Sequence, residues 1–375
     1  DDSLEALWRL AAWNRAESKA TVIGVTGSYG KTTTRQMVHW VLASQSTARQ
    51  SPRNFNNHVG LPLSLLRLED ADRFAVLEMG ASAPNEISRL TELARPQMGI
   101  LTGLGRAHLQ GFGSVDNVAL EKSALLRGLP ADGLAVVPQE FRARLGEIGC
   151  RGQTVGTCAG ASILAHDVRQ TAQGVCFVVD GQTFEVPVAG RHFVDAALSA
   201  VAIARESGLT DLETSRSLST FRGAAGRCHV WRLGDHTLID DTYNASPETV
   251  AAACRLLEDW QTVGRRMLVL GEMAELGDAA AACHAEAGAV AAGCRVDDLW
   301  ACGRWAQQVV AGAAGSGRPI HAETAGSVEG LREQVFAAMR PGDVLLVKGS
   351  RSAGMERMVN WLRERFEERP LKASA

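Results

Sequence analysis

A glycine-rich segment near the start of the chain has the residue types that bind nucleotide phosphates. It reads Thr26-Gly27-Ser28-Tyr29-Gly30-Lys31-Thr32, and Val25 stands where the usual motif has its first glycine. Glycines let backbone N–H groups turn toward a phosphate, and a helix N-terminus adds partial positive charge. Lys31 can then reach the β- and γ-phosphates, and the hydroxyl of Thr32 can bind Mg²⁺; an ordinary strand–helix turn is the alternative. We therefore expect ATP to bind Thr26, Gly27, Ser28, Gly30, Lys31, Thr32 and Thr33.

One further side chain, Glu78, has chemistry that suits a metal-bound phosphate, whereas the patterns around His108 and Lys122 indicate more ordinary roles. Glu78 ends an expected strand, and ligands of open α/β sheets bind outside the carboxyl ends of the strands. A carboxylate there suits Mg²⁺, which prefers oxygen ligands, although a surface glutamate or a helix cap would show the same pattern. His108 follows another expected strand by a short loop, where a lone histidine more often forms a loop or core hydrogen bond. Lys122 lies in a helical segment that by itself indicates a solvated lysine.

The elements that must position these residues alternate along the chain. Short β-branched runs are followed by helical stretches, which indicates a parallel sheet covered by helices. In the first part of the chain we expect strands at 21–26, 74–78, 98–102 and 134–137, and helices at 4–13, 31–43, 85–94, 115–126, 194–207 and 212–221. Asp180-Gly181 lies between two apolar runs and predicts a β-hairpin.

A second series of strands and helices follows the small, glycine-rich segment 222–226, where we expect a domain boundary. Its expected strands are 237–241, 266–270, 298–301 and 344–347, and its expected helices are 247–260, 283–292, 305–313, 328–339 and 355–366. The predicted fold class is therefore α/β. Residues 1–224 would form a P-loop central ATPase domain with a mainly parallel sheet, and residues 225–375 a C-terminal Rossmann-like α/β domain.

The composition argues against several classes of protein. The chain has 375 residues, a formal net charge of −3 and 22% charged residues, so neither nucleic acid nor a membrane surface is an expected partner. Its apolar runs are shorter than the roughly 20 residues that span a membrane, and no signal peptide is visible. The 8 cysteines include no CxxC pair, which indicates reduced thiols in the cytoplasm. Because the chain begins with Asp1, we expect a processed chain or a piece of a longer one.

Seven stretches, in order along nearly the whole chain, resemble the motifs of the Mur ligases. They are residues 24–33, 54–62, 77–80, 107–109, 240–245, 270–277 and 347–352. Asn54-Phe55-Asn56-Asn57, EMAELG at 272–277 and KGSRS at 348–352 most resemble the branch of the family that adds D-alanyl-D-alanine.

The resemblance implies an ATP-dependent amide ligase that acts in peptidoglycan precursor synthesis. A carboxylate of a UDP-muramoyl-peptide would attack the γ-phosphate of ATP to give an acyl phosphate. The amine of D-Ala-D-Ala would then displace phosphate, and charge neutralisation around the phosphoryl group would lower the barrier most. The resemblance also implies that this chain lacks the family's N-terminal domain, which grips the UDP part of the substrate. We expect a cytoplasmic monomer.

The resemblance also implies roles for individual residues. Catalytic roles fall to Lys31, Lys122, His108 and Asn54, and Mg²⁺ would be bound by Thr32, Glu78, His108 and a carbamylated Lys122. Arg227 and Asp241 would contact the nucleotide once the two domains close on each other. The substrate-binding candidates are Asn56, Asn57, Asn244, Glu275, Lys348, Ser350 and Arg351.

The residue patterns alone leave other roles open for these positions. The asparagines could form a loop and an N-cap, and Arg227 could belong to a surface ion pair. Lys348 and Arg351 could belong to a solvated basic turn between a strand and a helix. His284 is as consistent with a helix surface as with function.

The chain departs from the family pattern at two places. Phe193 and Ala196 replace two asparagines that lie near the adenine in relatives, so nucleotide contacts there are expected to be weaker or rebuilt. Ser246 replaces another asparagine, but it can still cap a helix that begins with Pro247. Two other functions stay open: a Mur-like ligase with a different acid and amine, as in folate or cyanophycin enzymes, or a non-catalytic ATP-binding paralogue.

Overall fold

The structure is a computed structural model that describes residues 2–171 and 173–367. The chain divides into two compact units. The first unit contains Asp1–Arg169, Val175–Pro187 and Arg191–Arg222, and the second contains Gln170–Gly174, Val188–Gly190 and Gly223–Ala375. None of the described helices is both long enough and apolar enough to span a membrane. The cysteines in the described residues are free thiols.

The first unit is built on a seven-stranded sheet with the order β2-β3-β1-β4-β5-β6-β7. All of its strand pairs are parallel. The strands are β1 (Thr21–Thr26), β2 (Ala48–Gln50), β3 (Phe74–Glu78), β4 (Met98–Leu101), β5 (Leu134–Pro138), β6 (Arg151–Gly156) and β7 (Ile163–Leu164). Val25 of β1 pairs with Glu78 of β3, and Thr26 pairs with Leu101 of β4. The carboxyl ends of three adjacent strands therefore lie side by side.

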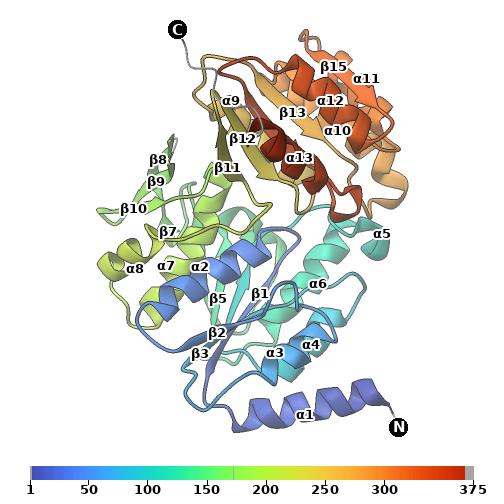
Figure 1. The fold of residues 1–375 in the computed structure, drawn as a ribbon. Coiled ribbons are helices and arrows are strands. Elements are labelled where there is room, and N and C mark those ends of the chain that lie inside the picture. Colours follow the sequence, from blue (N-terminus) through green and yellow to red (C-terminus); the bar gives the residue numbers. More distant parts are fainter. Residues whose placement is uncertain (1, 172, 368–375) are drawn as a thin grey trace. The chain divides into compact units, whose positions relative to one another are not determined.

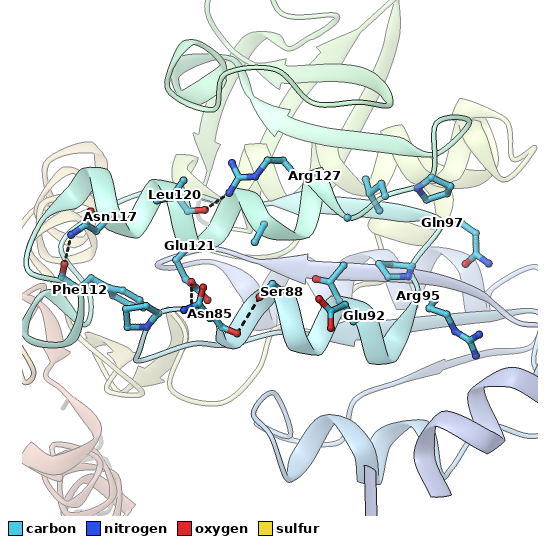
Figure 2. A pocket seen from close by; sticks show the side chains of 17 residues that line it. Asn85, Ser88, Glu92, Arg95, Gln97, Phe112, Asn117, Leu120, Glu121 and Arg127 are labelled. Atoms are coloured by element: carbon cyan, nitrogen blue, oxygen red, sulfur yellow. Dashed lines mark hydrogen bonds between the residues drawn. The ribbon is translucent and has the colours of Figure 1, made fainter. Parts of the chain in front are cut away.

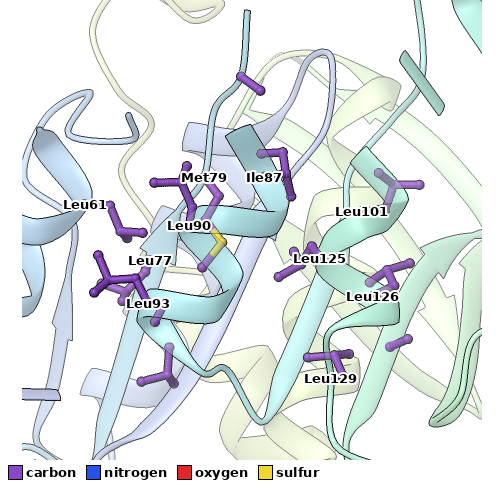
Figure 3. Packing of buried hydrophobic residues seen from close by; sticks show 14 of the residues in the cluster. Leu61, Leu77, Met79, Ile87, Leu90, Leu93, Leu101, Leu125, Leu126 and Leu129 are labelled. Carbon is purple, nitrogen blue, oxygen red and sulfur yellow. The ribbon is translucent and has the colours of Figure 1, made fainter. Parts of the chain in front are cut away.

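Helices cover this sheet on both faces (Figure 1). The helices of this unit are α1 (Ser3–Glu17), α2 (Lys31–Ala43), α3 (Gly60–Leu65), α4 (Glu86–Ala94), α5 (Leu109–Phe112), α6 (Val115–Arg127), α7 (Val194–Glu206) and α8 (Asp211–Leu218), with 3₁₀ turns η1 (Gln139–Arg144) and η2 (Arg191–Phe193). Helices α2 and α7 pack against each other, and α4 packs against α6. Figure 3 shows Leu90 of α4 and Leu125 of α6 in a buried cluster with Leu77 and Leu101 of the sheet.

A small sheet of β8 (His166–Thr171), β9 (Gly174–Val179) and β10 (Gln182–Val186) follows the large sheet. Strands β9 and β10 are antiparallel, with Val179 opposite Gln182, so the hairpin predicted at Asp180-Gly181 is confirmed. Phe177 and Phe184 stack across it with their ring centroids 5.4 Å apart.

The second unit has a six-stranded sheet with the order β11-β12-β16-β13-β14-β15. The strands are β11 (His229–Leu233), β12 (His236–Asp241), β13 (Arg266–Leu270), β14 (Asp298–Cys302), β15 (His321–Ala325) and β16 (Val344–Lys348). Only the β11–β12 pair is antiparallel among these described strand pairs. Its helices are α9 (Pro247–Asp259), α10 (Ala280–Gly293), α11 (Ala306–Ala314), α12 (Val328–Ala338) and α13 (Glu356–Glu367), with 3₁₀ turns η3 (Gly277–Ala279) and η4 (Arg351–Ala353).

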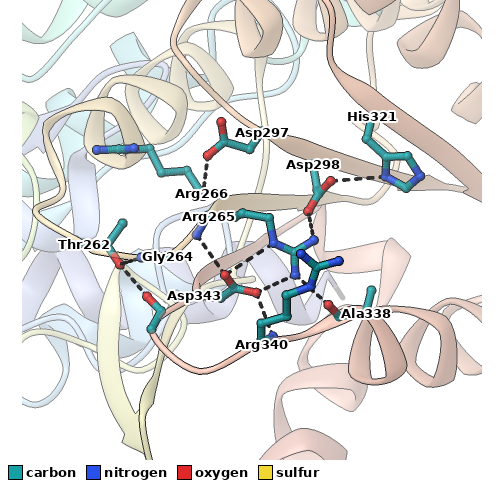
Figure 4. A network of polar contacts seen from close by, with 11 residues as sticks. Thr262, Gly264, Arg265, Arg266, Asp297, Asp298, His321, Ala338, Arg340 and Asp343 are labelled. Carbon is teal, nitrogen blue, oxygen red and sulfur yellow. Dashed lines mark hydrogen bonds and ion pairs between the residues drawn. The ribbon is translucent and has the colours of Figure 1, made fainter.

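A buried polar network ties together the amino ends of the central strands of the second unit (Figure 4). The Arg265 guanidinium lies 2.6 Å from an Oδ of Asp343 and 2.7 Å from an Oδ of Asp298. Burial alone would raise the pKa of Asp343, but hydrogen bonds from Arg265 and from the backbone N–H of Arg340 hold it below its ordinary value. The carboxylate is therefore charged at neutral pH and fixes the starts of β13 and β16.

Helices α10 and α11 pack with their backbones in contact. A Cβ added at Gly312 would lie 1.8 Å from the carbonyl oxygen of Ala285, and one added at Gly288 would lie 1.8 Å from that of Val309. No side chain can occupy these positions without moving a helix. The two glycines therefore set the distance between the helices.

The substitution Gly312→Ala should separate α10 from α11. We expect it to lower the free energy of unfolding by about 1–3 kcal/mol, the usual range for overpacking. Denaturant unfolding measures the change. The matched control is Gly293→Ala at the end of α10, where an added Cβ meets no atom within 4 Å. Equal losses in the two variants would contradict this account of the packing.

Candidate functional site

Hydrogen bonds with the residues that follow β4 hold the glycine-rich loop after β1 in position. Gly30 has the left-handed conformation, with φ of 78°, and directly precedes α2. The backbone N–H of Ser28 donates to the carbonyl oxygen of Gly103 at 2.8 Å, and the hydroxyl of Thr102 donates to the carbonyl of Tyr29. The loop therefore has the strand–loop–helix geometry that directs N–H groups toward a phosphate.

Lys31 is the first residue of α2, and its side chain turns back over the loop. Its Nζ donates to the carbonyl oxygen of Gly27 at 2.8 Å. Thr33 and Ser28 are buried beside it, and the Thr26 hydroxyl donates to the carbonyl of Met79 at 2.8 Å. The predicted nucleotide-binding residues of the first unit thus belong to one loop.

Glu78 is the centre of a buried polar cluster at the end of β3. Its carboxylate accepts hydrogen bonds from the Thr32 hydroxyl at 2.9 Å and from Asn56 Nδ2 at 2.8 Å. Arg35 Nη1 lies 3.5 Å from the same carboxylate, and both side chains are 2% exposed. A buried carboxylate of this kind must be paired, because an unpaired charge in the interior is costly.

Arg35 was not predicted from the sequence. It follows Lys31 by one helical turn, so it lies on the same face of α2, and that spacing is the signal that could have identified it. Ser51 was also missed; its Oγ accepts from the backbone N–H of Glu78 at 3.0 Å. No local pattern marks Ser51, because it meets Glu78 only through the pairing of the strands.

The donor set at Glu78 fits Mg²⁺. The Thr32 hydroxyl and the Glu78 carboxylate are oxygen ligands, and they already lie 2.9 Å apart. Within the described residues, no group of three or more His, Cys, Asp or Glu gathers to hold a metal. Mg²⁺ is commonly bound by one or two carboxylates together with substrate phosphates and water, so Thr32 and Glu78 are the residues that would hold it here.

Lys122 is buried, although the sequence of its helix by itself indicates a solvated lysine. Its side chain is 1% exposed, and Nζ donates to the carbonyl of Ala81 at 3.0 Å and lies 5.3 Å from the centre of the Phe112 ring. Burial, the larger cause, and the nearby charge of Lys31 together lower the pKa of Lys122 to about 7. Two lysines that are far apart in sequence therefore act on each other.

The remaining predicted residues of the first unit have different surroundings. Asn57 Oδ1 accepts a hydrogen bond at 2.9 Å from the backbone N–H of Gly60, the first residue of α3, although Val59 is the N-cap residue of that helix. Asn54 is exposed. His108 is half-buried at the start of α5, with a φ of 60°. Its assignment as a metal ligand, like the catalytic role of Asn54, stays a prediction.

In the second unit, predicted residues follow the ends of three strands. Lys348 is 2% exposed, and its Nζ lies 2.6 Å from Asp241 Oδ2 and donates to the carbonyl of Asn244 at 2.9 Å. Arg227 stacks on the Tyr243 ring, 4.1 Å from its centre. Lys348 is therefore not a residue of a solvated turn.

Ser350, Arg351 and Glu275 lie in the loops that follow β16 and β13. Ser350 is 1% exposed, and its Oγ is 3.1 Å from that of Ser352. Arg351 is largely exposed and pairs with Glu356 at 3.4 Å. Glu275 has a left-handed backbone, with a φ of 61°. A substrate role for these residues stays a prediction.

A groove of about 1010 Å³ lies between α4 and α6 (Figure 2). Glu121 lines it and accepts from the backbone N–H groups of Asn85 and Ile87, each at 2.7 Å, which caps the start of α4. None of the predicted site residues lines the groove. It is therefore separate from the Glu78 cluster.

Comparisons with known proteins agree with this geometry. Residues 25–204 match the Mur ligase middle domain, and residues 226–351 match the Mur ligase, glutamate ligase domain. A UDP-N-acetylmuramoyl-tripeptide–D-alanyl-D-alanine ligase of Bacillus subtilis is 35% identical over 367 residues, which are 97% of this chain and 80% of that protein. The chain belongs to the Mur ligase family.

Solved structures show the same architecture as this Mur ligase. MurF from Acinetobacter baumannii superposes with a TM-score of 0.90 at 29% identity, over 97% of this chain and 81% of that one. MurF from Thermotoga maritima in complex with ADP gives a TM-score of 0.88 at 25% identity, over 99% of this chain and 86% of that one. The predicted family and the predicted α/β fold are confirmed.

The departures from the family pattern lie in a buried part of this Mur ligase. Phe193 and Ala196 are each 7% exposed, where α7 begins. Between them lies Asp195, whose pKa is raised to about 6 by burial, the larger cause, together with the charge of Glu140. Apolar packing thus occupies the two positions where the family pattern has asparagines.

The pKa of Lys122 makes a testable contribution to stability. Its folded pKa is about 7 against an ordinary value of 10.5, so the folded protein binds fewer protons between these values than the unfolded chain does. Stability should therefore rise with pH in this window, by up to about 1.4 kcal/mol per pH unit. In Lys122→Met this contribution is lost. We expect Lys122→Met to be more stable than the wild-type protein near pH 7, because burial disfavours the charged amine of the wild type there. This advantage should shrink from about pH 7 to about pH 9, as measured by denaturant unfolding.

Buffers free of CO₂ separate this titration from carbamylation of Lys122. Adding ¹³C-bicarbonate should then give a carbamate carbon resonance that is missing in Lys122→Met. A stability difference between the two proteins that stays constant across the pH range would show that folding does not lower the pKa of Lys122.

Proposed function

We propose that this chain is an ATP-dependent ligase that joins D-alanyl-D-alanine to UDP-N-acetylmuramoyl-tripeptide. The observation that carries the proposal is the 35% identity, over 97% of this chain, to a protein named for that reaction. The first unit supports it with a phosphate loop that has Lys31 and Thr32 in place and with Glu78 beside Thr32. These are the groups that a phosphoryl-transfer step requires.

The residues of the first unit suit the first half of the reaction. The tripeptide carboxylate would attack the γ-phosphorus of ATP, so that the bond to the ADP oxygen breaks and an acyl phosphate forms. Lys31 and the N–H groups of the loop would stabilise the charge on the transferred phosphoryl group. Thr32 and Glu78 would hold Mg²⁺, which supplies further neutralisation of the phosphate charge.

The second half of the reaction forms the amide. The amine of D-Ala-D-Ala would attack the acyl carbon, lose a proton, and release inorganic phosphate. The polar residues after β12, β13 and β16 are the predicted binding groups for this dipeptide, because ligands of open α/β sheets bind at the carboxyl ends of strands. Asn244, Glu275, Lys348, Ser350 and Arg351 are the candidates.

Lys122 has the properties that carbamylation requires. A neutral amine reacts with CO₂ to give a carbamate and a proton, and a pKa of about 7 leaves much of Lys122 neutral near physiological pH. The carbamate would add a carboxylate-like group near Lys31. We include in the proposal that this group, with His108, binds a second Mg²⁺.

Lys31→Ala tests the role of the phosphate loop. ATP turnover should fall by at least about 10²-fold, since one preorganised contact to the developing charge is typically worth that much. The matched control is Lys19→Ala, because Lys19 is exposed and precedes β1. Phosphate release is the assay, and circular dichroism checks the fold. Equal activity in the two variants would remove the phosphate loop from the mechanism.

The amine substrate is tested by the dependence of phosphate release on added amines. With ATP and UDP-muramoyl-tripeptide, release should require D-Ala-D-Ala, whereas L-Ala-L-Ala and single amino acids should give only the background rate. A different amine that works as well would indicate another Mur-like ligase. ATP binding without release for any amine would indicate the non-catalytic paralogue.

A further inference from the structure

Two loops of the second unit are bonded to each other at the carboxyl ends of neighbouring strands. They are the 271–277 loop after β13 and the 349–352 loop after β16. The backbone N–H of Gly271 donates to the carbonyl of Lys348 at 2.7 Å, and that of Ser350 donates to the carbonyl of Glu272 at 2.9 Å. A displacement of the 271–277 loop would therefore also disturb the 349–352 loop.

The two loops are also packed closely against the segment that leads into α13. A Cβ added at Gly271 would lie 2.7 Å from the sulfur of Met355, and one added at Gly349 would lie 2.5 Å from Cγ of the same methionine. Met355 is buried. Met355 thus fixes the position of Gly271 at the start of the 271–277 loop. The residues that follow Gly271 must be held by other contacts.

His284 of α10 gives this support to the 271–277 loop. Its side chain is buried, with a residue exposure of 1%, and Nε2 accepts a hydrogen bond from the backbone N–H of Met273 at 2.9 Å. Its Nδ1 lies 2.7 Å from the carbonyl oxygen of Ala280. A carbonyl oxygen can only accept, so Nδ1 carries the proton and Nε2 is the free acceptor.

The surroundings of His284 favour this single neutral tautomer. Burial lowers the pKa of His284, while the Ala280 carbonyl and the charge of Glu272 partly oppose the shift. The Trp305 ring lies 6.1 Å away, centre to centre. A proton on Nε2 would face the N–H of Met273, so the charged form would lose the bond to the loop.

We propose that His284 is a positioning residue that holds the 271–277 loop, and through it the 349–352 loop, in the conformation that binds the amine substrate. Glu275 and Ser350 lie on these loops, where ligands of an open α/β sheet bind. Glu275 and Ser350 are candidates for holding the dipeptide under the proposed function, so we take the dipeptide as the substrate that these loops bind. The identity of that dipeptide rests on the proposed function.

Two amide substitutions separate the two hydrogen bonds of His284. The side chain of glutamine places its terminal group near the position of Nε2, whereas that of asparagine reaches only as far as Nδ1. His284→Gln therefore keeps an acceptor for Met273, and His284→Asn leaves that buried N–H without one. The two variants differ by a single methylene group, so they form a matched pair.

We expect His284→Asn to raise the KM for D-Ala-D-Ala by about tenfold, the usual size for an unsatisfied buried N–H. The KM for ATP should change less than twofold, and His284→Gln should restore the KM for the dipeptide. Equal effects of the two variants, or parallel rises in both KM values, would overturn the proposal. They would indicate a general packing role for His284.

Hydrogen exchange gives a measurement that does not depend on the substrate. The Met273 amide should exchange faster in His284→Asn than in His284→Gln, while β13 keeps its protection. Unchanged exchange, or faster exchange without a change in the dipeptide KM, would overturn the proposal. If the wild-type protein shows no phosphate release that depends on D-Ala-D-Ala, the proposed function fails instead, and exchange at Met273 still decides whether His284 holds the loop.

Discussion

The buried carboxylate of Glu78 is the constraint on which the first unit's site depends. A charge that is 2% exposed is tolerable only with partners, and removing one partner costs more than the pair contributes. Its partners come from separate segments: Thr32 and Arg35 from α2, and Asn56 from the loop before α3. Pairing Glu78 therefore aligns β3, the phosphate loop and the asparagine segment at the same time. Moving any of these segments away would leave the buried charge without one of its partners, which is costly.

Two lysines of the first unit, Lys31 and Lys122, also influence each other electrostatically. Lys122 and Lys31 lie close enough for one charge to lower the pKa of the other, and both Nζ groups donate to backbone carbonyls. Two cations at low dielectric repel each other, so an anion placed between them would be bound strongly. A bound phosphate would relieve this repulsion, and so would the proposed carbamate on Lys122, which would reverse one of the charges.

The features that can be predicted from the sequence are those that depend on residues adjacent to one another in the chain. Strands β1 and β3 have the predicted bounds, because central parallel strands are continuous apolar runs. Strands β2, β11 and β15 were not predicted, since they lie at sheet edges and contain exposed or polar residues such as His229 and His321. Helix α1 continues beyond its predicted end because buried Arg15 donates to the carbonyl of Ala94 at 2.7 Å. The phosphate loop is a local motif, but the burial of Lys122 and the pairing of Arg35 arise only from tertiary packing.

In the second unit, one group of charged residues pairs at the amino ends of the strands. The predicted substrate-binding residues of this unit lie at the carboxyl ends. Arg265, Asp343 and Asp298 pair at the amino ends of β13, β14 and β16, so they fix the register of these strands without occupying the carboxyl ends. The loops at the carboxyl ends are joined mainly by backbone hydrogen bonds and by the Lys348–Asp241 pair. Loops held in this way can vary in sequence while the strands stay in place. Under the proposed function, changes in these loops would alter the amine substrate, while buried contacts such as that of His284 with Met273 would keep the loop backbone in position.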